Sequence, residues 1–190
     1  VLSSAVIDYF SRDAVFDYKI FWKRSMRCAI TSRIIALKCG MKSCGGVFTA
    51  GLLHDIGKVV FAEIAPERYL EVNQDRQDNE IIEQENQIFG MAHPEVGFML
   101  VDNWGLPNEI IQPVRFHHAF GDAQECTDLV AIVALGSLMA STYGKINKDN
   151  VQDFANACQE LLKTLNLSEK EFVAILGESS KAIKEDSEVH

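Results

Sequence analysis

The residues best suited to chemistry in this chain begin in the string GLLHDIGK, where His54 is directly followed by Asp55. Three further histidines follow, His93 and the adjacent pair His117 and His118. Imidazole and carboxylate groups are common ligands for borderline transition metals. The sequence therefore predicts a metal site at these five residues, either complete or modified.

A cation held by such nitrogen and oxygen donors could be Fe, Mn, Ni, Zn or Mg, and the alternative is a site that has lost its metal. A bound cation could activate water for attack on a phosphoester. Lys58 lies four residues after His54, so on one continuous helix the two side chains would share a face and Lys58 could contact a phosphate oxygen. Taken singly, each of these residues has an ordinary alternative, because most lone histidines and lysines on helices are packing or surface residues.

Composition limits the classes of function. The chain has 190 residues, 47% of them hydrophobic and 24% charged, which is typical of one soluble globular domain. A net charge of -9 argues against nucleic acid, because phosphate contacts need clusters of lysine and arginine. We find no signal peptide and no apolar run of about 18 residues that could span a membrane. Five cysteines, an odd number without an export signal, favour reduced thiols and a cytoplasmic location.

The elements that must position these residues are predicted to be helices almost throughout, because apolar residues recur at helical spacing and no segment alternates like a strand. We expect helices at residues 19–39, 43–54, 66–70, 78–89, 94–104, 107–118, 129–143, 151–165 and 169–184, with Asp17, Ser43, Asp78, Thr127 and Ser168 as caps. Pro113 should kink or split its helix. Residues 1–190 are expected to form a single domain with a frayed tail at 185–190.

Several short motifs follow one another in a recognisable order. These are FWKRS at 21–25, AGLLHDIGK at 50–58, Glu85, FG at 89–90, His93, Gly97, WGLP at 104–107 and HH at 117–118. Together they resemble the HD superfamily and, within it, the HDOD family, the HD-related output domains of bacterial signalling proteins. The resemblance covers about residues 22–139. It implies an all-α, HD-domain-like multi-helix bundle.

The family usually carries a further helical lobe before this bundle. The residues that precede Trp22 are too few to form that lobe. Because the chain also begins with Val1, we expect it either to be part of a longer protein or to depart from the family layout.

The chain departs from the catalytic members of the HD superfamily at two expected ligands. Where they carry a further histidine ahead of the HD pair, this sequence has Arg24, and where they carry a late aspartate, it has Ser137. The sequence after His118 reads Ala-Phe-Gly-Asp and lacks the Gly-Tyr-Pro element of cyclic-di-GMP phosphodiesterases. Arginine is always charged and cannot ligate a metal. We therefore hypothesise that Arg24 pairs with Asp55 and balances its charge in place of a metal, the alternative being a solvent-facing Arg24.

Three interpretations of function remain open on the sequence. The first is a regulatory HDOD domain with a degenerate metal site, which binds a signalling protein or a small ligand without hydrolysis. The second is a metal-dependent phosphohydrolase acting on a nucleotide or another phosphoester. The third is a structural domain whose polar cluster is a hydrogen-bonded core network. None of the three calls for a nucleic acid or a membrane as partner, and the sequence specifies no oligomeric state.

Overall fold

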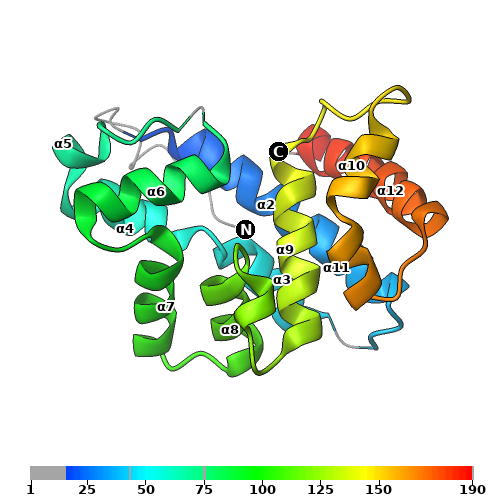
Figure 1. Ribbon diagram of the computed structural model, residues 1–190, viewed down its shortest axis with the longest axis horizontal. Helices are drawn as coiled ribbons and strands as arrows, with labels where there is room; N and C mark the ends of the chain where they lie inside the picture. Colours follow the sequence, from blue (N-terminus) through cyan, green and yellow to red (C-terminus); the bar gives the residue numbers. More distant parts are fainter. Residues whose placement is uncertain (1–15, 43, 75, 190) are drawn as a thin grey trace.

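The computed structural model describes residues 16–42, 44–74 and 76–189. These residues form helices and no strand, which confirms the all-α prediction (Figure 1). The elements are α2 (Tyr18–Lys38), α3 (Gly45–Leu53), α4 (Ile56–Ile64), α5 (Pro66–Tyr69), α6 (Asp78–Phe89), α7 (His93–Asn103), α8 (Asn108–Phe116), the short 3-10 helix η1 (Phe120–Asp122), α9 (Thr127–Ser141), α10 (Val151–Ala157), α11 (Gln159–Thr164) and α12 (Glu169–Val189).

The long helix α2 runs through the centre of the bundle. The Asp17 carboxylate accepts a hydrogen bond from the Ile20 amide at 2.9 Å and so caps its start, as predicted. α2 packs against α3, α9 and α12. Its buried face carries mostly small residues, including Ala29 and Ala36, which let the neighbouring helices approach closely.

Two groups of helices lie on either side of α2 and α9 (Figure 1). The helices that carry the HD string and the other histidines, α3, α4, α7 and α8, pack on one side, together with α5 and α6. The helices α10, α11 and α12 lie on the other side and share an apolar core with α9, centred on Leu135, Phe172 and Ile175. In the sequence, the helices of the histidine side therefore precede α10, α11 and α12.

Four helix predictions are corrected by the structure. Helix α4 was not expected, because no helix was predicted between the one at residues 43–54 and the one at residues 66–70. The helix expected at residues 151–165 is two helices, α10 and α11, which meet at Cys158. Helix α8 continues through Pro113, so of the kink or split expected there the split is contradicted; a proline removes a single amide donor. Helix α12 runs past Lys184 to Val189, where we expected the chain to fray; His190 lies outside the described residues.

Some of the predicted helix caps are confirmed and others are wrong. Ser168 does cap α12, since its hydroxyl accepts from the Glu171 amide at 3.3 Å and the Glu171 carboxylate accepts from the Ser168 amide at 2.8 Å. Asp78 is instead the first residue of α6, and Gln77 is its N-cap. Thr127 is likewise the first residue of α9 rather than its cap. The cap expected at position 43 lies outside the described residues.

None of the helices that the structure describes is both long and apolar enough to cross a membrane.

Candidate functional site

His54 and Asp55 lie in a break between two helices. Helix α3 ends at Leu53 and α4 begins at Ile56, with Asp55 as the N-cap of α4. The expectation that Lys58 and His54 share one face of a continuous helix is therefore wrong. The Lys58 ammonium instead turns back to Asp55, with Nζ 2.8 Å from Oδ2, and only 3% of the residue is exposed.

Gly57 brings α4 against the start of α7. A Cβ at this position would lie 2.0 Å from the His93 carbonyl oxygen and 2.8 Å from the Gly97 amide nitrogen. No residue other than glycine fits this contact without moving the backbone of one helix. The close approach places His93 beside Asp55, although the two residues are far apart in the sequence.

His93 is oriented by a buried carboxylate from α6. Glu85 Oε2 accepts two hydrogen bonds from His93, one from the backbone amide at 2.8 Å and one from ring Nδ1 at 2.6 Å. Helix α6 ends at Gly90 in the left-handed conformation, with φ of 78°, and this turn carries the chain back to His93. Because a carboxylate only accepts, Nδ1 carries a proton and Nε2 is the atom that faces Asp55.

The other buried imidazoles are oriented in the same way by backbone carbonyls. His54 Nδ1 donates to the Gly51 carbonyl at 2.8 Å, and His117 Nδ1 donates to the Val114 carbonyl at 2.9 Å. In each neutral ring the remaining nitrogen, Nε2, is therefore an acceptor. Carbonyl and carboxylate partners of this kind commonly fix the tautomer of a metal-binding histidine.

The Nε2 atoms converge on one side of Asp55. Oδ1 lies 3.1 Å from His93 Nε2 and 3.5 Å from His117 Nε2, and His118 Nε2 lies 3.2 Å from His93 Nε2. One ligand atom from each of these four residues falls within 4.8 Å of the other three, and we call this set the Asp–His cluster. His54 is adjacent but outside it, with Nε2 3.5 Å from Oδ2 of Asp55.

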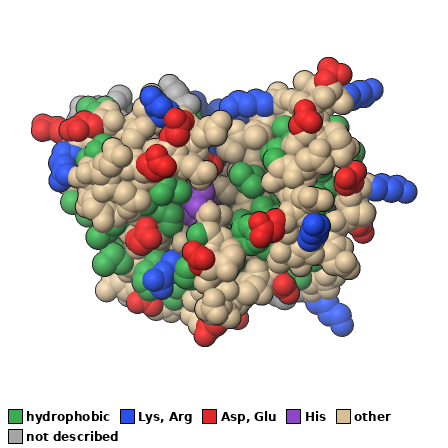
Figure 2. Space-filling view, viewed as in Figure 1, with side chains coloured by type: hydrophobic (Ala, Val, Ile, Leu, Met, Phe, Trp, Pro, Cys, Tyr) green, Lys and Arg blue, Asp and Glu red, His purple; other side chains and the backbone are tan. Residues whose placement is uncertain are grey.

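Access to the Asp–His cluster is restricted. His54, His93 and His117 are buried, whereas His118 is partly exposed. Histidine surface is visible at the floor of a hollow between the two sides of the bundle (Figure 2). A small solute can therefore reach this part of the molecule from solvent.

The cluster has acceptors without donors. His117 Nε2 and Asp55 Oδ1 are buried and have no hydrogen-bond partner among the described residues, and neither has His54 Nε2. Buried acceptors of this kind need a hydrogen-bond donor, such as water, or a cation between them. A divalent cation fits this set of ligand atoms. A second proton, on His93 Nε2, would give Asp55 Oδ1 a hydrogen-bond donor but would leave His117 Nε2 without one. Burial and Lys58 lower the pKa of His93, but the neighbouring carboxylates of Asp55 and Glu85 outweigh them and raise it above the usual value.

Arg24 lies near Asp55, but its closest partner is another residue. Its Nη2 donates to Asp78 Oδ1 at 2.7 Å, whereas its Nε is 3.7 Å from Asp55 Oδ2. Burial alone would raise the pKa of Asp55, but Lys58, His54 and Arg24 hold it well below its usual range. Lys58, rather than Arg24, therefore supplies the closest balancing charge at Oδ2. Arg24 does form the hypothesised ion pair with Asp55, but this pair is looser than its hydrogen bond to Asp78.

The sequence analysis did not predict the roles of Glu85 and Asp78 in the site. Glu85 was noted only as part of a motif, and Asp78 only as a helix cap, yet they orient His93 and Arg24. Ser137 lies buried in α9, and its hydroxyl has no hydrogen-bond partner among the described residues. The sequence signal for Glu85 is its place on the same helical face as Ile81 and Ile88, where a lone acid needs a partner.

Solved structures of similar fold come from bacterial proteins. An HDOD domain protein of unknown function from Geobacter sulfurreducens has a TM-score of 0.74 at 24% identity, covering 94% of this chain and 65% of that one. A candidate phosphohydrolase from Shewanella amazonensis has a TM-score of 0.70 at 19% identity, covering 96% and 65%. The response regulator MmoQ from Methylococcus capsulatus has a TM-score of 0.65 at 21% identity, covering 85% and 62%. This chain thus spans less than two thirds of each.

Comparison of the sequence with known proteins identifies the family. An uncharacterized protein of Treponema pallidum is 30% identical over 94 residues, which are 48% of this chain and 18% of that protein. The family model of the HDOD domain matches residues 1–120, which include the HD string, Glu85, His93 and the histidine pair. The chain therefore belongs to the HDOD domain family.

Proposed function

We propose that this chain is a regulatory domain of a bacterial signalling protein, which binds a partner protein or a small ligand and does not hydrolyse phosphoesters. One observation carries the proposal: the Oδ2 side of Asp55 is occupied by cationic side chains. Lys58 Nζ is 2.8 Å from this oxygen and Arg24 Nε is 3.7 Å from it. A metal bound at Oδ2 would lie within a few ångströms of two positive charges.

The same charges limit how many cations the site could hold. Only the Oδ1 side of Asp55, facing the other members of the Asp–His cluster, remains open to a cation. The resemblance to the HD superfamily implies that catalytic members use a histidine where this chain has Arg24 and an aspartate where it has Ser137. With these two ligands replaced, the cluster supports one cation at most.

Family and fold agree with a signalling role. The match to the HDOD domain extends through the site, and the similar fold of MmoQ belongs to a response regulator. All five cysteines are free thiols, which supports the inference of a cytoplasmic location. We infer that any partner is recognised through the surface of the bundle, since the site residues are largely buried.

A second candidate function is metal-dependent hydrolysis of a phosphoester, and the Asp–His cluster favours it. Asp55, His93, His117 and His118 would hold the cation. When bound, a divalent cation supplies Lewis-acid polarisation of a phosphoryl oxygen. Lys58 Nζ already donates to Asp55, so a phosphate oxygen would have to reach this buried ammonium at one of its remaining two protons.

Metal analysis combined with a phosphoester assay tests the proposal. The 190-residue chain is loaded with Mn²⁺ or Ni²⁺, its metal content is measured, and turnover of bis-p-nitrophenyl phosphate is compared among variants. We expect no turnover above that of Asp55→Asn or His54→Ala. The matched control is Asp102→Asn, an exposed aspartate on α7.

The three interpretations give different outcomes in this assay. Turnover that is lost in Asp55→Asn and kept in Asp102→Asn would establish the hydrolase and contradict the regulatory proposal. At most one bound metal without turnover would support the regulatory domain. Neither metal nor any bound ligand or partner would favour a purely structural polar core.

A further inference from the structure

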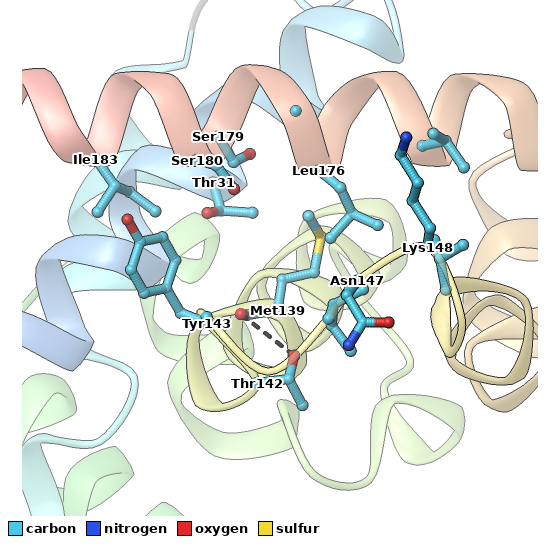
Figure 3. A pocket seen from close by; sticks show the side chains of 15 residues that line it. Thr31, Met139, Thr142, Tyr143, Asn147, Lys148, Leu176, Ser179, Ser180 and Ile183 are labelled. Atoms are coloured by element: carbon cyan, nitrogen blue, oxygen red, sulfur yellow. Dashed lines mark hydrogen bonds between the residues drawn. The ribbon is translucent and has the colours of Figure 1, made fainter.

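A pocket separate from the Asp–His cluster lies between α2, α9 and α12, closed on one side by the loop after α9 (Figure 3). Its volume is about 300 Å³. Apolar atoms make most of the wall, and the hydroxyl groups of Thr31, Thr142, Tyr143, Ser179 and Ser180 lie among them. The residues that matter are Met139, Tyr143, Leu176, Ile183, Thr31 and Ser179.

We propose that this pocket binds a small, uncharged organic molecule, with an apolar body against α9 and α12 and one polar atom that pairs with the Ser179 hydroxyl. The inference does not depend on whether the HD site holds a metal or hydrolyses a substrate. It goes beyond the proposed function by assigning a ligand site to the C-terminal side of the bundle.

Ser179 is the observation that points to a ligand. Only 3% of this residue is exposed, and its hydroxyl has no hydrogen-bond partner among the described residues. A serine within a helix can usually satisfy its hydroxyl on a carbonyl of the preceding turn, so a buried unpaired hydroxyl is a cost that the fold retains. In Figure 3, Thr31, Ser179 and Ser180 lie at one end of the pocket, and Lys148 lies at the other.

The walls of the pocket are formed in advance of any ligand. The guanidinium of Arg27 lies 4.3 Å above the ring centroid of Tyr143 and holds one face of that ring. Met139 is 5% exposed and fixed in α9. At Gly177 the pocket is open, because a Cβ there would have no heavy atom within 4 Å. Ligand pockets are typically preformed and mostly apolar in this way.

Charge and size define the class of ligand. Among the residues that line the pocket, Lys148 is the one with a charged side chain, and it is exposed. A charged group would therefore find no buried counter-ion inside, and burying it would be unfavourable. The volume is at the lower end of the range for ligand sites, about 300–1,000 Å³. The ligand is therefore a compact molecule, such as a one- or two-ring compound with a hydroxyl or carbonyl group.

The probe pair 1-naphthol and 1-methylnaphthalene tests the proposal, because the two have similar shape and differ by one hydroxyl. Each is titrated into the ¹⁵N-labelled 190-residue chain while amide shifts are followed. We expect shifts at residues 142–148 and 176–183, and 1-naphthol should bind about two- to tenfold more tightly. Ser179→Ala should abolish that preference while leaving 1-methylnaphthalene binding unchanged.

Two further variants keep the result interpretable. Gly177→Leu places a side chain in the open space of the pocket and should weaken both probes about tenfold or more, without removing any existing contact. Ala174→Leu, on an exposed position of α12, is the matched control and should change neither affinity. Shifts confined to the Asp–His cluster, equal affinity for the two probes, or an unchanged preference in Ser179→Ala would each overturn the proposal.

Discussion

Lys58 and Asp55 form a buried ion pair across the first turn of α4, with Nζ 2.8 Å from Oδ2 and side chains that are 4% and 2% exposed. The pair divides the carboxylate into two functional halves. Oδ2 is held by Lys58, while Oδ1 faces His93 and His117. A site that resembles a metal centre in its ligands therefore carries an internal cation on one side.

Replacing this lysine should be far more damaging than replacing an exposed one. Lys58→Met leaves the Asp55 carboxylate buried without its closest partner, so we expect a loss of about 3 kcal/mol or more in the free energy of unfolding. The control is Lys38→Met, whose pair with Glu178 has side chains 36% and 51% exposed and should contribute less than about 1 kcal/mol. Urea denaturation of both variants measures the difference; equal small losses would contradict a buried pair.

Glu85 should affect cation binding without being a ligand. It fixes His93 with Nδ1 protonated and Nε2 directed to Asp55. Glu85→Gln weakens this orientation, and loss of such a partner typically lowers metal affinity by about 10- to 100-fold. Calorimetric titration with Ni²⁺ measures the effect, and Glu80→Gln, an exposed change on the same helix, is the control. Unchanged Ni²⁺ affinity in Glu85→Gln would show that the negative charge of Glu85 does not support cation binding through His93.

The Asp–His cluster shows how far the sequence could lead. All four members of the cluster were among the predicted metal ligands, because side-chain chemistry and the order of motifs can be identified from the sequence. The helix expected at residues 43–54 ends close to the observed break, but the new helix directly after it was not foreseen, and Lys58 was placed as though the first helix continued. The structure ends α3 at Leu53 and starts a new helix with Asp55 at the N-cap position, where its carboxylate pairs with Lys58 rather than with a first-turn amide.

Long-range charge pairing was the part that the sequence could not supply. Arg24 and Asp78 are 54 residues apart, and helical periodicity carries no information about which helix faces which. Their pairing depends on how α2 and the start of α6 pack in three dimensions. The same limit applies to Lys58, whose partner was misassigned because its position relative to His54 depended on an unbroken helix.

Stability should fall as the pH is lowered from 7 to 5. Burial lowers the pKa of His54 to about 3 and also lowers the pKa values of His117 and His118, while the pKa of His93 is raised. Below the unfolded value of about 6.5, the unfolded chain therefore takes up more protons at these histidines than the folded protein does, and protonation favours unfolding. Thermal unfolding between pH 7 and 5 tests the sign.

His54→Gln provides the control for this pH effect. It removes one histidine whose folded-state pKa is depressed, so the slope of stability against pH should become shallower by up to about 1.4 kcal/mol per pH unit. A slope that stays the same would show that His54 takes up a proton in the folded protein over this range.

The contact of α4 with α7 should tolerate no side chain at Gly57. The Cβ of Gly57→Ala would lie 2.0 Å from the His93 carbonyl oxygen, so one helix must move and His93 must shift relative to Asp55. We expect a loss of more than about 3 kcal/mol in the free energy of unfolding, at the upper end for overpacking. Gly46→Ala, in α3, is the control: its nearest contact would be Glu109 Cβ at 3.6 Å, so better helix propensity should raise stability by about 0.5–1 kcal/mol. Denaturation measures both effects.

The same displacement separates His93 from Asp55, two members of the Asp–His cluster. Any folded Gly57→Ala protein should therefore also bind Ni²⁺ more weakly. Unchanged affinity would show that the cluster does not depend on this helix contact.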